Sequence, residues 1–184
     1  MSKKQVHVLG LVGSPRRGGN TDTLVDEVLR GASEAGAPTE KVRFSDLDIR
    51  PCDACDACRG GSPCPKKDDF NGVLEKMRLS SVWVLGTPVY WWGPTAQTKA
   101  FIDRWYGVDK ALFRGKKVVL VVPSGGGSSY SDTTVEMLES IASYLGMRRL
   151  ATIRAPGTSS PGSARSDEAL MRRARALGDE SVKR

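Results

Sequence analysis

Residues 13–21 combine small residues with side chains that bind anions, and they lie between an apolar run and an amphipathic stretch. This order predicts a strand, a loop and a helix start in series. Backbone N–H groups at a helix start lack intrahelical partners, and the helix dipole favours negative charge there. Ser14, Asn20 and Thr21 add hydrogen-bonding groups, and Arg16 adds a fixed positive charge. The segment therefore predicts a phosphate site.

Three common kinds of phosphate loop do not match this segment. It lacks the Gly-Lys-Ser/Thr ending of nucleoside-triphosphatase loops and the G-x-G-x-x-G pattern of dinucleotide-binding loops. It also lacks the Cys-x5-Arg pattern of cysteine phosphatases. What remains is a phosphomonoester at the end of the first strand, where the flavodoxin-like sheet holds FMN. A polar turn without a ligand is the alternative.

The four cysteines of the chain lie close together, as Cys52, Cys55, Cys58 and Cys64. A disulfide framework does not suit a cytoplasmic protein with no cysteine elsewhere. Iron–sulfur clusters take four thiolates and suit closely spaced C-x2-C-x2-C runs, whereas structural zinc more often uses two separated C-x2-C pairs. The candidates are therefore an iron–sulfur cluster, free or redox-active thiols, and zinc.

The elements that must position these residues follow from a regular alternation of apolar runs and amphipathic stretches. Three of the runs are almost continuously apolar, as in strands buried on both faces of a parallel sheet. The pattern predicts an α/β fold, a doubly wound five-stranded parallel sheet. The predicted strands are 6–12, 41–44, 82–86, 118–122 and 150–153, and the predicted helices are 21–35, 69–79, 94–106 and 132–145.

Ligands of such sheets bind beyond the carboxyl ends of the strands, so the loops there are the places to look. Besides residues 13–20, these loops are 87–93 and 123–130. Tyr90, Trp91 and Trp92 could form apolar walls for a planar ring, and core or interface packing is the alternative. The glycines of the third loop would let the backbone approach a ligand closely, or form a surface turn.

Composition limits the remaining choices. The chain has 184 residues, which suits one sizeable domain, and no apolar run long enough to span a membrane. Residues 1–4 run directly into a predicted strand and leave no room for a signal peptide, so we expect a cytoplasmic protein. The net charge of +7 is concentrated late in the chain without a nucleic-acid-binding motif, which argues against nucleic acid as a partner.

Residues 13–21, 87–104 and the glycine-rich third loop together resemble the NAD(P)H-dependent FMN reductase family of the flavodoxin-like superfamily. The resemblance implies helices on both faces of the sheet and hydride transfer from NAD(P)H to FMN. The reduced flavin would then pass electrons to a small-molecule or protein acceptor such as a quinone or another flavin. It also implies a homodimer or homotetramer. The NADH or NADPH preference stays open.

The resemblance further implies a set of cofactor-binding residues. The first loop would hold the FMN phosphate, the second would follow the ring and ribityl chain, and the third would contact the other side of the ring. In this order the residues are Ser14, Arg16, Asn20 and Thr21; Pro88, Val89, Tyr90, Trp91, Trp92 and Gly93; and Ser124, Gly125 and Gly126.

The cysteine pattern resembles that of iron–sulfur flavoproteins, a branch of the same superfamily in which FMN and a [4Fe–4S] cluster exchange electrons. This implies an alternative function, the shuttling of electrons between protein partners. We therefore expect an FMN-binding domain at residues 1–155 with a cysteine-rich insertion at about 50–68. Residues 156–184 would form a basic C-terminal tail, in which a short helix, a loose end and a partner-contacting arm are all open.

Overall fold

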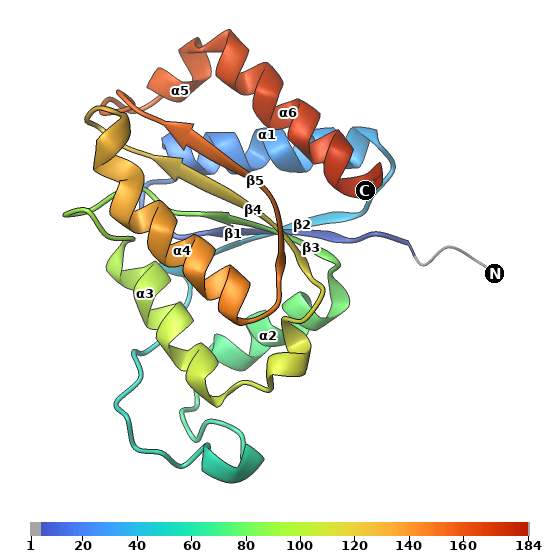
Figure 1. The fold of residues 1–184 in the computed structure, drawn as a ribbon, viewed down its shortest axis with the longest axis vertical. Coiled ribbons are helices and arrows are strands. Elements are labelled where there is room, and N and C mark those ends of the chain that lie inside the picture. Colours follow the sequence, from blue (N-terminus) through green and yellow to red (C-terminus); the bar gives the residue numbers. More distant parts are fainter. Residues whose placement is uncertain (1–4, 184) are drawn as a thin grey trace.

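A parallel sheet lies at the centre of the computed structural model, which describes residues 5–183 (Figure 1). Residues 1–4, on which the expected cytoplasmic location rests, and residue 184 lie outside the described part. The sheet has the order β2-β1-β3-β4-β5. Its strands are β1 (Val8–Val12), β2 (Thr39–Arg43), β3 (Val82–Gly86), β4 (Lys117–Pro123) and β5 (Arg148–Ala155).

Helices cover both faces of this sheet. One face packs against α1 (Asn20–Glu34), α5 (Ser163–Ser166) and α6 (Glu168–Lys183). The other packs against α2 (Phe70–Leu79), α3 (Ala96–Asp103) and α4 (Asp132–Tyr144). All strand pairs are parallel and the order is that of flavodoxin, so the predicted flavodoxin-like doubly wound fold is confirmed.

The inner strands were predicted from the sequence more accurately than the edge strands, and their positions in the sheet explain the difference. The inner strands β1 and β3 are buried throughout, because helices cover both of their faces. The edge strands β2 and β5 are exposed where they begin and become more buried toward their ends, and both begin two residues before the predicted apolar runs. Helix α3 starts later than predicted because Thr95 caps it, with its side chain accepting a hydrogen bond from Thr98 N.

Most of the basic C-terminal segment packs on the sheet domain as α6, which lies along α1 (Figure 1). The two helices approach closely at glycines: a Cβ on Gly31 would lie 1.9 Å from the carbonyl oxygen of Arg175, and one on Gly178 would lie 2.0 Å from that of Val28. Arg175 also donates to Glu27 Oε2 over 2.8 Å. Small residues and an ion pair therefore attach this helix to the domain.

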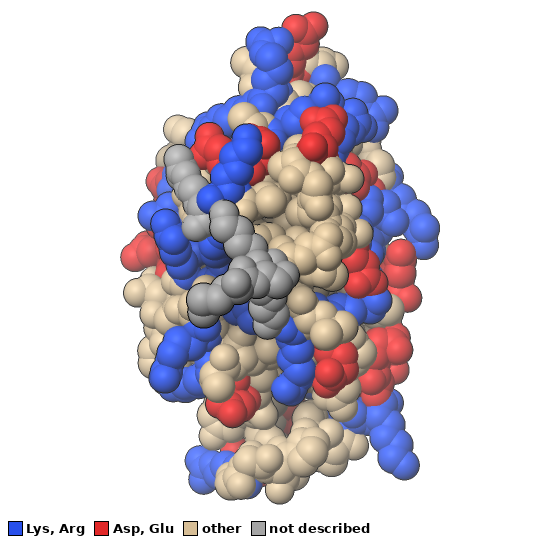
Figure 2. Space-filling view, turned by 90° about the vertical axis from the view of Figure 1, so that its right-hand side faces the viewer, with Lys and Arg blue, Asp and Glu red and all other residues tan. Residues whose placement is uncertain are grey.

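The surface carries charges of both signs. On the face that Figure 2 shows, Lys and Arg side chains are interspersed with Asp and Glu. Within residues 5–183, none of the helices has the length and apolar character that crossing a bilayer requires.

Candidate functional site

The loop after β1 is shaped by its own glycines and by a buried carboxylate. Gly18 has a φ of +65°, a conformation that favours glycine, and its N–H donates to Asp22 Oδ2 over 2.7 Å. Ser14 is buried, and its Oγ accepts a hydrogen bond of 3.2 Å from Arg16 N. The Arg16 residue is exposed and Thr21 is buried at the start of α1. The loop thus ends at the N–H groups of α1.

Asp22 ties this loop to the edge strand β2. Its carboxylate accepts hydrogen bonds from Lys41 Nζ over 2.9 Å and from Arg43 Nη2 over 2.8 Å. Burial by itself raises the pKa of the Asp22 carboxyl, but the hydrogen bonds from Arg43, Gly18 and Lys41 outweigh it, so the pKa lies below its ordinary value. The carboxylate is therefore a charged anchor of the loop.

Asn20 contacts a segment that the sequence did not connect with this loop. Its Nδ2 donates to the carbonyl oxygens of Thr158 and Ser160 over 2.8 and 2.9 Å, and its Oδ1 accepts from Ala164 N over 3.1 Å. The first residue of α1 is therefore joined to the loop that follows β5, at the same edge of the sheet.

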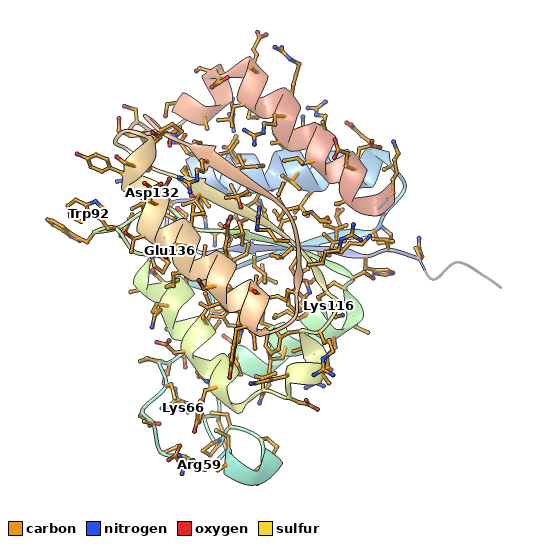
Figure 3. All side chains as sticks on the ribbon, in the orientation of Figure 1. Arg59, Lys66, Trp92, Lys116, Asp132 and Glu136 are labelled. Carbon is orange, nitrogen blue, oxygen red and sulfur yellow. The ribbon has the colours of Figure 1, made fainter. Side chains whose placement is uncertain are left out.

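The second loop ends in a tight turn of two tryptophans. Tyr90 and Gly93 exchange backbone hydrogen bonds of 2.8 and 3.0 Å, and Trp91 and Trp92 between them have φ values of +50° and +59°. Such a conformation is strained for residues with a Cβ. The side chain of Trp91 is 90% exposed and that of Trp92 is 51% exposed. The turn thus holds aromatic surface outside the core (Figure 3).

Trp92 has partners in the third loop and in α4. Its ring stacks on that of Tyr130, with centroids 6.1 Å apart and an interplanar angle of 21°. Its carbonyl oxygen accepts a hydrogen bond of 2.9 Å from Thr134 Oγ1. The second and third loops are therefore adjacent.

Thr95 joins the second loop to the first. Its Oγ1 donates to the carbonyl oxygen of Gly13 over 2.6 Å, and its N–H donates to Thr87 Oγ1 over 3.1 Å. Pro88 and Val89 lie between these anchors, and Val89 N donates to the carbonyl of Pro123 at the end of β4 over 3.1 Å. These bonds hold the backbone of the second loop between its neighbours.

The third loop carries an unpaired buried hydroxyl. Ser124 is 4% exposed, and within residues 5–183 its Oγ has no hydrogen-bond partner. The backbone around it is held, because Ser124 O accepts from Thr158 N and Gly126 O accepts from Gly157 N, each over 2.9 Å. Gly125 packs against Ser159. A buried hydroxyl without a partner is costly, so Ser124 fits a polar atom of a ligand.

The cysteine-rich segment forms an extended loop between β2 and α2. All four cysteines line one pocket, together with Arg104, Tyr106 and Gly107, which follow α3. Ala54 and Asp56, which alternate with the cysteines, have φ values of +55° and +56°. In this conformation no three Cys, His, Asp or Glu side chains within the described 5–183 are arranged to hold a metal ion. The cysteines are therefore neighbours, but they are not arranged as a ligand set.

Arg104 attaches this loop to the fold. Its guanidinium is buried and forms an ion pair with the buried Asp68, and its Nη1 also donates to the carbonyl of Arg50 over 3.3 Å. Its Nη2 donates to Cys64 Sγ over 3.3 Å. Burial raises the pKa of the Asp68 carboxyl, but the hydrogen bonds from Arg104 and from backbone N–H groups outweigh it and lower the pKa overall.

The cysteine loop lies at the far end of α3 from the aromatic turn. Arg59 and Lys66 of this loop lie below α3, and Trp92 lies beyond the start of that helix (Figure 3). Arg59 Nε donates to the Tyr106 hydroxyl over 3.4 Å, just after α3. The described structure thus brings the three post-strand loops together and leaves the cysteines apart from them.

Comparison with known proteins decides the family. The sequence profile described as NADPH-dependent FMN reductase matches residues 6–155, which is most of the chain. The chain belongs to this family. FMN and NAD(P)H are the cofactors of the NADPH-dependent FMN reductase family, and the matched residues include all three post-strand loops and the cysteine loop.

Two of the relatives that match this chain are named as iron–sulfur flavoproteins. An iron–sulfur flavoprotein of Methanocaldococcus jannaschii is 41% identical over 97 residues, which cover 53% of this chain and 50% of the relative. One of Methanosarcina thermophila is 36% identical over 121 residues, covering 66% and 63%. The chain thus spans about half to two thirds of the length of these relatives.

The solved structures support the same fold. An NAD(P)H:quinone oxidoreductase from Methanothermobacter marburgensis superposes with a TM-score of 0.78 at 20% identity, and the alignment covers 96% of each chain. At this identity the likeness concerns the fold.

The sequence did not reveal several residues that shape the candidate site of this FMN reductase family member. Asp22, Thr95 and Arg104 act through partners distant in sequence, which no local pattern reveals. The loop after β5 did carry a signal. It is rich in Pro, Gly and Ser and follows a parallel strand, so it had to start at the ligand-binding edge.

Proposed function

We propose that the protein is an FMN-dependent oxidoreductase that transfers a hydride from NAD(P)H to bound FMN and on to an acceptor such as a quinone or a flavin. The observation that carries this proposal is the meeting of the first and second loops at the carboxyl edge, joined by the hydrogen bond from Thr95 to Gly13. One loop offers a helix start with Arg16, and the other offers aromatic surface.

The residues of the chain would bind and orient the cofactor. Ser14, Arg16, Thr21 and the N–H groups of α1 would hold the phosphate. The backbone of the second loop would follow the ring, and the Ser124 hydroxyl would gain a polar partner. FMN when bound supplies the hydride chemistry, so the protein needs no acid–base pair. His7, the only histidine, precedes β1 at the opposite edge of the sheet.

A comparison of FMN with riboflavin tests the phosphate assignment. Arg16→Ala should weaken FMN binding by roughly 1.5–3 kcal/mol, the worth of a hydrogen bond to a charged group, and leave riboflavin binding unchanged. Arg17→Ala is the matched control, since Arg17 is exposed and pairs with Asp46. Equal FMN affinity in all three proteins would contradict this assignment.

A second candidate function is that of an iron–sulfur flavoprotein that shuttles electrons between protein partners. It is favoured by the four cysteines that line one pocket and by the N–H donor that Arg104 offers to Cys64. Ala54 and Asp56, on either side of Cys55, have positive φ values, and turns of this kind are found where backbone N–H groups form the nests of iron–sulfur sites. Holding a [4Fe–4S] cluster would require the four thiolates to move together.

Anaerobic reconstitution with iron and sulfide tests this candidate. If the cysteines hold a cluster, the wild type takes up iron and gives a paramagnetic signal when reduced. A variant with all four cysteines replaced by serine should not. Equal iron uptake by the two proteins would exclude the cluster and leave the reductase proposal intact.

The assembly and location are part of the same proposal. The exposed rings of Trp91, Trp92 and Tyr130 would be covered in a homodimer or homotetramer in the cytoplasm. Light scattering at micromolar concentration tests the assembly, and a monomer with and without FMN would contradict it.

A further inference from the structure

The side-chain amide of Asn20 is fully engaged by one distant segment. An asparagine amide has two N–H donors and one carbonyl acceptor. The donors reach the carbonyls of Thr158 and Ser160, with Ser163 Oγ a third acceptor at 3.2 Å. The acceptor takes the N–H of Ala164. No donor of this amide is left for a ligand unless a bond to the segment breaks.

The segment held in this way, residues 157–164, lies across the third loop. Gly157 N donates to Gly126 O, and Thr158 N donates to Ser124 O. The Thr158 hydroxyl donates to Ala155 O over 2.8 Å at the end of β5. At the far end of the segment, Ala164 is fully buried in the core that α1 and α6 share. Asn20 thus connects the start of α1 to the wall formed by Ser124–Gly126.

We propose that Asn20 is a positioning residue, which fastens segment 157–164 across the third loop and does not bind the phosphate itself. The proposal rests on the proposed function, in which residues 13–21 hold the FMN phosphate. It leaves Ser14, Arg16, Thr21 and the backbone of α1 as the phosphate ligands. It also assigns a role to the loop after β5, which keeps the third loop in place before the flavin arrives.

The physical reason is a competition between acceptors. A phosphate oxygen that took an N–H from Asn20 would leave the carbonyl of Thr158 or Ser160 without this donor. Arg16 is exposed and free to turn toward the ligand, whereas Asn20 is held by bonds at both ends of its amide. We therefore expect Arg16 to bind the phosphate and Asn20 to keep its hydrogen bonds to segment 157–164.

Hydrogen exchange on the flavin-free protein tests whether Asn20 holds the segment in place. Asn20→Ala should raise the exchange rates of the Thr158 and Ala164 amides by roughly 10-fold or more, since several hydrogen bonds that hold the segment closed are lost. Asn71→Ala is the matched control, because Asn71 is an exposed asparagine in the first turn of α2. Asn20→Ser, which cannot reach both carbonyls, is the milder variant if Asn20→Ala folds poorly.

The ratio of FMN to riboflavin affinity separates positioning from phosphate binding. Asn20→Ala should change both affinities by the same factor and keep the wild-type ratio, whereas Arg16→Ala should lower the ratio. The proposal would be overturned if Asn20→Ala or Asn20→Ser lowered the ratio of FMN to riboflavin affinity as Arg16→Ala does. In that case the amide exchange rates at residues 158 and 164 would stay unchanged. An unchanged ratio in Arg16→Ala would instead contradict the phosphate loop, which distinguishes the two failures.

The wild-type protein provides a measurement that needs no variant. The side-chain amide of Asn20 should be visible by NMR as a slowly exchanging pair of signals in the flavin-free chain, while that of the exposed Asn71 exchanges fast. Its exchange should stay slow when riboflavin or FMN binds. Fast exchange in the flavin-free chain, or exchange that becomes slow only when FMN is bound, would contradict the positioning role.

Discussion

Thr95 Oγ1 and the carbonyl oxygen of Gly13 are joined by a hydrogen bond of 2.6 Å between two segments that lie 82 residues apart. The same hydroxyl accepts the N–H of Thr98 at the start of α3, so one side chain caps a helix and links two loops. Thr95 is fully buried. The geometry of the candidate site therefore depends on a residue that would not touch the ligand.

Replacement of Thr95 by Val should destabilise the protein by about 2 kcal/mol, because a helix cap and a buried hydrogen bond are lost at nearly constant volume. Urea unfolding measures the change. Thr133→Val, at an exposed position in α4, is the control and should have little effect. Thr95→Ser should recover most of the loss, and a Thr95→Val protein as stable as the wild type would contradict the role of the hydroxyl.

A methyl group at Gly13 has no room. A Cβ there would lie 1.8 Å from Thr98 Oγ1 and 3.2 Å from the carbonyl oxygen of Gly86. Gly13→Ala should therefore cost roughly 1–3 kcal/mol of unfolding free energy, as overpacking does. Gly72→Ala, a helical glycine with open space around its Cβ position, should instead stabilise by about 0.5–1 kcal/mol.

A double-mutant cycle identifies the clashing group. Thr98→Ala removes the hydroxyl that a Cβ on Gly13 would meet, so the double variant should lose less stability than the sum of the single variants. Strict additivity would show that the methyl group clashes with something else.

The stability contributed by Asp22 should depend on pH. The pKa of its carboxyl is lower in the folded than in the unfolded protein, so its contribution is complete above about pH 4, the unfolded value, and is lost as the pH falls through the folded pKa. The difference in unfolding free energy between the wild type and Asp22→Asn should therefore shrink on acidification below about pH 4. A difference that stays constant to the lowest pH at which the protein folds would contradict this.

Loss of the Arg104 guanidinium should leave the buried Asp68 carboxylate without its charge partner. Arg104→Met should cost about 3–5 kcal/mol, the usual effect of breaking a buried ion pair. Arg104→Met with Asp68→Asn should recover part of this loss. The buried charge is removed, and the amide oxygen can still accept one of the two backbone N–H groups, of Arg50 and Phe70, that the two carboxylate oxygens of Asp68 accept.

The control for this pair is Arg173→Met on the exposed side of α6. Limited proteolysis adds a local readout, because the cysteine loop should be cut faster in Arg104→Met. Equal cutting in all the variants would show that Arg104 does not anchor this loop.

The parts of the fold that the sequence predicted well are those governed by local pattern. Continuous apolar runs identified the inner strands, and the residues that follow them identified the ligand-binding edge. Helix α6 was harder to predict, because the residues that it buries are small: Ala174, Gly178 and Ser181. A helix with such a face lacks the large apolar stripe that usually marks a packed helix. The spacing of these small residues was the signal for close helix packing.

The parts that could not be predicted depend on long-range partners or on strain. Asn20 lies in a phosphate-binding pattern, yet its amide bonds with residues near the other end of the chain. Trp91 and Trp92 adopt a left-handed turn that sequence statistics assign to Asn and Gly, and the bonds between Tyr90 and Gly93 hold it closed. Neither arrangement follows from propensity.

The most direct test of the central claim is an anaerobic titration of the FMN-loaded protein with NADH and with NADPH, followed through the visible absorbance of the flavin. We expect that one equivalent of at least one of the two nucleotides bleaches the bound flavin, and that an added quinone restores the colour. A bound flavin that stays oxidised in excess of both nucleotides would contradict the account.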